Sequence, residues 1–104
     1  MKLLFLTPHL STSGMPQFLL KRIEAIKQYA KGIEVFVFEW EQTTVNYTVQ
    51  RDKIVKLVGK NFFSCGYVQD GNEDGRAENH NNFVNYCYKN KIDIIHTEDI
   101  VEYF

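Results

Sequence analysis

KLLFLT, residues 2–7, is a short and almost continuous apolar run that Pro8 ends. Such a run fits a strand that is buried on both faces, as strands of a parallel sheet are. Residues 33–40 read IEVFVFEW, and their β-branched and aromatic side chains predict a second strand. Between the two runs, Pro16 suits the first turn of a helix. Apolar residues follow it at helical spacing, namely Leu19, Ile23, Ile26 and Ala30. Strand, helix and strand in this order predict a βαβ unit.

The middle of the chain continues with weaker patterns. Gly32 is expected to supply the left-handed residue that ends the first helix. After a polar loop, residues 45–50 predict a third strand, and residues 51–58 predict a helix because their apolar side chains recur at helical spacing. Three glycines and many polar residues predict a loop over residues 64–79.

The last third of the chain predicts one more helix and one more strand. Apolar residues paired four positions apart predict the helix over about residues 77–90, which is rich in asparagine. We expect His80 and these asparagines to lie on the solvated surface. Residues 93–97, DIIHT, predict a short strand. The whole pattern predicts one α/β domain over residues 1–104, a Rossmann-like three-layer sandwich with a mostly parallel sheet of about four strands in the order 3-2-1-4.

Composition and charge indicate a globular domain and argue against several kinds of partner and site. A length of 104 residues with 44% hydrophobic and 24% charged residues is typical of one globular domain. Twelve basic and thirteen acidic residues give a formal net charge of -1, which offers no field to attract nucleic acid or an anionic membrane. No apolar run is long enough for a signal peptide or a membrane span. Cys65 and Cys87 lack the spacing of a disulfide framework or a zinc site, so we expect a reducing cytoplasm.

The loop after the first strand contains small polar residues, Ser11, Thr12, Ser13 and Gly14. It precedes a helix, whose free backbone N–H groups and dipole favour an anion such as phosphate. Gly14 allows close approach of the backbone, and the hydroxyl groups add donors. The alternative is that these residues only turn the chain and cap the helix. The sequence contains no GxGxxG or GxxxxGK[ST] motif for a dinucleotide or P-loop site.

Three further polar residues follow predicted strands at the end where open parallel sheets bind ligands. His96 and Glu98 come with the last strand, and His9 follows the first. A histidine and a carboxylate can orient a hydroxyl group or accept its proton. The alternative is that His96 is a structural residue near the core whose hydrogen bonds are satisfied within the protein. The spacing of the three residues matches no metal site, so we expect no metal.

At these same residues the chain resembles a known family. Residues 6–17, LTPHLSTSGMPQ, are similar to the first loop of group 1 glycosyltransferases of the GT-B fold, which often carry a Gly-Gly pair. Ser13 stands where the first glycine of that pair would be. Residues 93–99, DIIHTED, resemble that family's Asp-hydrophobic-hydrophobic-His segment after the fourth strand, and residues 49–54, VQRDKI, are similar to a branch of the family.

The resemblance implies roles for individual residues. It implies that the phosphate of a nucleotide-sugar donor is contacted by Ser13, Gly14 and Met15. It implies that His96 and Glu98 lie near the hydroxyl acceptor. We therefore expect His96 and Glu98 to be catalytic, and His9 and Ser11 to bind the acceptor. The reaction would transfer a hexose-type unit, and no cofactor is expected.

Enzymes of this family have two Rossmann-like domains, and the resemblance covers only the first, acceptor-side one. We therefore expect residues 1–104 to be a truncated N-terminal domain that is inactive without the missing C-terminal, donor-binding domain. The alternative is a small stand-alone binding or interaction domain of flavodoxin-like shape, without catalysis. Reading the gene beyond codon 104 distinguishes the two, because only the first requires a second Rossmann-like domain.

The last strand is also expected to present an open edge. Asp93 is the only charged residue of the apolar segment 92–96, and unpaired N–H and C=O groups at such an edge are a template for another strand. We expect the isolated chain to self-associate through this strand or through the apolar tail after it, most simply as a twofold homodimer, because twofold closure uses the same patch on both copies.

Overall fold

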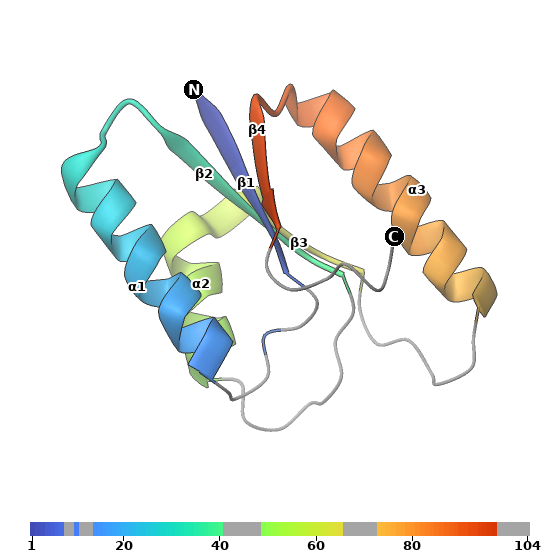
Figure 1. The fold of residues 1–104 in the computed structure, drawn as a ribbon, viewed down its shortest axis with the longest axis horizontal. Helices are drawn as coiled ribbons and strands as arrows, with labels where there is room; N and C mark the ends of the chain where they lie inside the picture. The colour runs from blue at the N-terminus through green and yellow to red at the C-terminus, as the bar shows by residue number, and fades with distance from the viewer. Residues whose placement is uncertain (8–9, 11–13, 41–48, 66–72, 98–104) are drawn as a thin grey trace.

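In the computed structural model, the chain forms an α/β domain in which helices cover both faces of a parallel sheet (Figure 1). The structure describes residues 1–7, 10, 14–40, 49–65 and 73–97. Within them the elements run in the order β1 (Lys2–Thr7), α1 (Gly14–Tyr29), β2 (Glu34–Glu39), α2 (Val49–Val58), a 3₁₀ turn (Gly59–Asn61), β3 (Phe62–Ser64), α3 (Glu73–Asn90) and β4 (Ile94–Thr97).

The sheet of the described residues has four strands in the order β3-β2-β1-β4, and every pair is parallel. Central strand β1 pairs with β2 over its whole length and with β4 from Leu3↔Ile94 to Leu6↔Thr97. The predicted α/β class, the parallel sheet and the order 3-2-1-4 are therefore confirmed. In Figure 1, α1 and α2 lie on one side of the sheet and α3 lies on the other.

Alternation along the two inner strands divides the core into two layers. Side chains of one parity, among them Phe5 and Val37, pack with the apolar stripes of α1 and α2. Side chains of the other parity, among them Leu4 and Phe38, pack under α3. Both faces of β1 and β2 are thus buried, which explains why their sequences read as continuous apolar runs.

The second layer is mainly aromatic. Phe38 stacks on Phe63 with ring centroids 5.0 Å apart and meets Phe83 and Tyr86 edge-on at 5.2 and 5.6 Å. Full burial of one such side chain contributes about 1.5–3 kcal/mol, so this cluster fixes α3 against the sheet.

Helix α1 follows the predicted pattern but differs at its end. Leu19 and Ile23 are buried against the sheet, while Lys21 and Glu24 are exposed. The expectation for Gly32 is wrong: among the described residues, positive φ angles occur at Gly59 and Lys91. The Ala30 N–H still bonds to the Ile26 carbonyl, and the chain then turns through residues 31–32.

The third strand is not where the sequence analysis placed it. Of the predicted strand 45–50, Val49 and Gln50 belong to helix α2, and residues 45–48 lie outside the described residues. The sheet instead uses β3, whose three residues pair with the carboxyl half of β2. Three residues are too few to show the alternation from which strands are predicted.

Helix α3 is longer than predicted and more involved in packing. It begins at Glu73, within the predicted loop, and ends at Asn90 as expected. Not all of its asparagines are on the surface, because Asn79 is 4% exposed and donates from Nδ2 to the Trp40 carbonyl at 3.0 Å. His80 is exposed, as expected, although its ring lies edge-on to Trp40.

Strand β4 lies at the edge of the sheet. Ile94 pairs with Leu3 and Ile95 with Leu4, so the two isoleucines face opposite layers, yet each remains nearly half exposed. No helix of the described residues is both long and apolar enough to cross a membrane.

The apolar edge at β4 leads to a test of the expected self-association. Replacement of Ile94 by lysine should weaken it by about tenfold or more, because a charged side chain on an edge strand opposes pairing. Val49→Lys is the control, since Val49 is an exposed apolar residue of α2. Sedimentation equilibrium measures both, and a wild-type chain that stays monomeric at high micromolar concentration would contradict the expectation.

Candidate functional site

The topology marks one position on the rim of the sheet. The crossovers through α1 and α2 lead from β1 toward β3 on one side, whereas the crossover through α3 leads back to β4 on the other. The order of strands therefore reverses between β1 and β4. In open parallel sheets this switch point, at the carboxyl ends of the strands, is where ligands bind. Strand β1 ends here at Thr7, and strand β4 ends here at Thr97.

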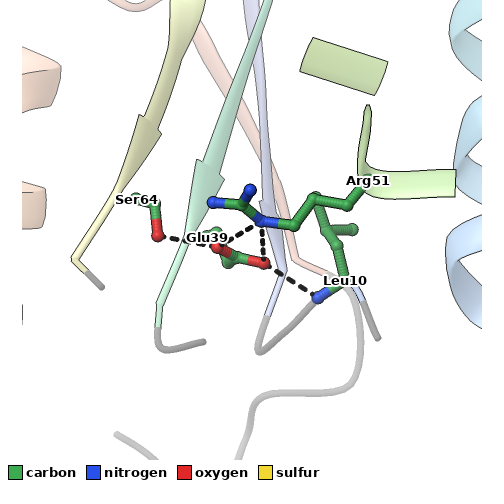
Figure 2. A network of polar contacts seen from close by, with 4 residues as sticks. All are labelled: Leu10, Glu39, Arg51 and Ser64. Atoms are coloured by element: carbon green, nitrogen blue, oxygen red, sulfur yellow. Dashed lines mark hydrogen bonds and ion pairs between the residues drawn. The ribbon is translucent and has the colours of Figure 1, made fainter. Parts of the chain in front are cut away.

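A buried carboxylate lies on the same rim. Glu39 is the last residue of β2, and its side chain is only 1% exposed. Its Oε2 accepts a hydrogen bond from the backbone N–H of Leu10 at 3.0 Å, and its Oε1 accepts one from the Ser64 hydroxyl at 2.6 Å. The Nε of Arg51 lies 3.2 Å from both oxygens (Figure 2). We call these four residues the Glu39 network.

The partners of Glu39 come from three separate parts of the rim. Leu10 belongs to the connection after β1, Arg51 to the first turn of α2, and Ser64 to the end of β3. A buried carboxylate without partners would be strongly destabilising, whereas this one has a charged partner and donors on both oxygens. The network therefore ties the ends of the first three strands into one unit.

Backbone bonds extend the rim beyond the strands. Trp40 donates its N–H to the Thr7 carbonyl at 2.8 Å, and Cys65 donates its N–H to the Glu39 carbonyl at 3.1 Å. Backbone hydrogen bonds between neighbouring strands thus continue for one residue past the ends of β2 and β3, next to Glu39.

The described thiols are not activated nucleophiles. Burial raises the pKa of Cys65 to about 11, and the charges of Glu39 and Glu78 add to this, while a hydrogen bond with Asn82 opposes it. Burial also raises the pKa of Cys87. Because the thiolate is the reactive form, both cysteines are protonated and unreactive near neutral pH.

His96 is the predicted catalytic residue whose side chain is described. It lies on β4, faces the α1 layer and meets the Phe5 ring edge-on at 5.5 Å. Arg22 of α1 places Nη1 3.1 Å from its Nε2. Because a guanidinium only donates, Nε2 is the acceptor and the neutral ring carries its hydrogen on Nδ1.

The other predicted site residues are described less fully. Gly14 is the first residue of α1 and Met15 the second, so the helix begins at the last residue of the predicted polar loop. His9, Ser11, Ser13 and Glu98 lie outside the described residues, so their predicted roles stay predictions. In the part of the chain that the structure describes, no group of three or more histidine, cysteine or acidic residues could hold a metal ion.

Sequence reasoning missed Glu39, Arg51 and Ser64. One signal was present: Glu39 follows the apolar run VFVF in a strand buried on both faces. A carboxylate in that position needs a buried partner, although the sequence does not identify it.

The chain was compared with family models, with curated proteins and with solved structures, and none of the three comparisons gives a match. Its function is therefore inferred from its own residues and from their arrangement on the rim.

The network leads to a test of stability. Glu39→Gln should lower the free energy of unfolding by about 2–4 kcal/mol, because an amide NH₂ would face N–H and O–H donors that now bond to a carboxylate. Glu34→Gln is the matched control on the same strand. It removes an exposed carboxylate and should cost less than about 0.5 kcal/mol. Urea unfolding followed by circular dichroism measures both, and equal stabilities of the two variants would refute the anchoring role.

Proposed function

We propose that this chain is the acceptor-side, N-terminal domain of a glycosyltransferase that moves a sugar from a nucleotide-sugar donor to a hydroxyl acceptor. The supporting observation is where the two resembling segments fall in the fold. Residues 6–17 run from the end of β1 into the start of α1, and residues 93–99 contain β4 and extend past its end. Both segments thus border the switch point, the position at which parallel sheets bind ligands.

In this proposal the donor diphosphate approaches the start of α1. That helix has 16 residues and begins with Gly14 and Met15, directly after Ser13. The free N–H groups of its first turn would therefore bind the anion in this proposal. Glu39 supports this arrangement because its carboxylate accepts a hydrogen bond from the N–H of Leu10, a residue of the connection between β1 and α1.

The acceptor hydroxyl lies near His9, Ser11 and β4 in this proposal. During transfer the acceptor oxygen bonds to the anomeric carbon of the sugar, the nucleoside diphosphate leaves, and the hydroxyl proton passes to a base. His96 is suited to orient or deprotonate the hydroxyl because its Nε2 is an acceptor in the neutral ring. The substrate hydroxyl would take the place of the Arg22 donor. Glu98 would assist from the residues after β4.

The donor sugar and nucleotide would be held mainly by a second Rossmann-like domain. Binding energy is then distributed over a cleft between two domains, of which this chain supplies one wall. The isolated chain is accordingly proposed to be inactive and to bind nucleotide sugars only weakly.

The proposal is tested on the protein encoded by the uninterrupted reading frame that contains residues 1–104. That protein should contain a second Rossmann-like domain and release nucleoside diphosphate from uridine or guanosine diphosphate sugars when a hydroxyl acceptor is present. His96→Ala should lower kcat by about 10²-fold, the lower range for loss of an acid–base group. His80→Ala, an exposed histidine of α3, is the control and should leave kcat unchanged.

Two outcomes would contradict this proposal. One is a stop codon directly after residue 104, which would favour the stand-alone binding domain of flavodoxin-like shape. The other is tight binding of a nucleotide sugar to the isolated chain in titration calorimetry, because that would place the complete donor site in this domain.

A further inference from the structure

The guanidinium of Arg51 is held by Glu39 at its inner nitrogen and by the ring of Phe62, over which its carbon lies. Its Nε points at the Glu39 carboxylate, and its guanidinium carbon lies 5.2 Å from the centre of the Phe62 ring. Among the described residues, neither terminal amino group donates a hydrogen bond, and neither is a buried polar atom without a partner. The side chain is 20% exposed, so these two groups reach solvent.

This arrangement differs from an ordinary structural ion pair. An arginine whose only role is to neutralise a carboxylate commonly faces it with two parallel N–H bonds. Here Nε alone serves Glu39, and Ser64 and Leu10 supply the remaining donors to that carboxylate. The planar fork of Arg51 is therefore oriented by its inner nitrogen, and Figure 2 draws dashed lines from that nitrogen and none from the two terminal nitrogens.

The position of Arg51 also favours a ligand. It lies in the first turn of α2, where the helix dipole is positive, and on the carboxyl rim of the sheet. Arg51 Nε and the Leu10 N–H share one oxygen of Glu39, so the inner nitrogen of the guanidinium lies close to Leu10, a residue of the connection between β1 and α1. The predicted phosphate loop belongs to that same connection.

We propose that Arg51 is an oxyanion-binding residue, whose two terminal amino groups take the phosphate oxygens of a ligand on the carboxyl rim of the sheet. Glu39 and Phe62 act as positioning residues for it. Because they fix the guanidinium before the ligand arrives, little side-chain entropy is lost on binding. The charge of Glu39 balances that of Arg51, so recognition depends on the geometry of the fork more than on net charge.

This inference deepens the proposed function, because a nucleotide-sugar diphosphate is one ligand with this chemistry. It would give the diphosphate a second contact beside the start of α1. The oxyanion site itself requires no sugar and no second domain, so it is tested without them.

The experiment is an NMR titration of the chain with inorganic pyrophosphate, following the side-chain signals of Arg51 and the amides of Ser13, Gly14 and Met15. We expect saturable shifts of the Arg51 signals. Arg51→Gln should raise the dissociation constant about tenfold or more, as loss of charge-assisted hydrogen bonds does. Lys53→Gln is the matched control: it removes the same charge from an exposed residue of α2 and should change the constant less than about twofold.

Arg51→Lys distinguishes the effect of the planar guanidinium from the effect of its charge. It also replaces the glutamine variant if that variant does not fold. It keeps a cation near Glu39 but lacks the planar pair of amino groups, so it should also bind pyrophosphate several-fold more weakly. Unshifted Arg51 signals at saturating pyrophosphate, or equal losses in the Arg51→Gln and Lys53→Gln variants, would overturn the proposal.

A final arm separates the two proposals. If neither uridine nor guanosine diphosphate sugars bind the full-length protein better than pyrophosphate does, while the Arg51 effect persists, the oxyanion site stands and the glycosyltransferase proposal fails. If nucleotide sugars bind and are turned over but Arg51→Gln has no effect on their affinity, the proposed role of Arg51 fails alone.

Discussion

Burial of the negative charge of Glu39 constrains how the residues at the carboxyl rim of the sheet are arranged. Glu39 ends a strand whose other side chains are almost all apolar and buried, so its carboxylate has to find partners inside the protein. It finds them in Leu10, Arg51 and Ser64, which belong to three different parts of the rim. Losing any partner leaves part of the charge unsatisfied, so these parts are held in position together. A rim that is fixed in this way can present donors to a ligand without first being ordered by it.

The general fold could be predicted from local sequence because its signals are strong. The apolar runs at 2–7 and 33–40 and the helical spacing between them lead directly to β1, α1 and β2. The third strand could not be predicted, since β3 has three residues and is defined by pairing with β2 rather than by its own pattern. The left-handed conformation expected of Gly32 is wrong because a glycine after a helix can also serve an ordinary turn, as Gly32 does.

The candidate site was predictable only where residue type and position on a strand agree. His96 lies on a strand, as the sequence predicts, whereas α1 already begins at Gly14, which the sequence analysis assigned to the preceding loop. The Glu39 network could not be assembled from sequence, because its members are brought together by strand order and by the path of α2. Asn79 illustrates the same limit: it lies in a helix rich in asparagine, and only the tertiary contact with the Trp40 carbonyl distinguishes it from its exposed neighbours.

Anchoring of the rim by Glu39 is tested most directly by native-state hydrogen exchange at the amide of Leu10. That amide lies in a connection rather than in a helix or strand, and the hydrogen bond that protects it is the one to Glu39. We expect the Leu10 amide to exchange as slowly as the amides of β1 in the wild-type chain. In the Glu39→Gln variant it should exchange much faster than Leu4, the reference residue of β1. A Leu10 amide that exchanges in the wild-type chain at the rate of an unprotected loop would contradict the anchoring role of Glu39.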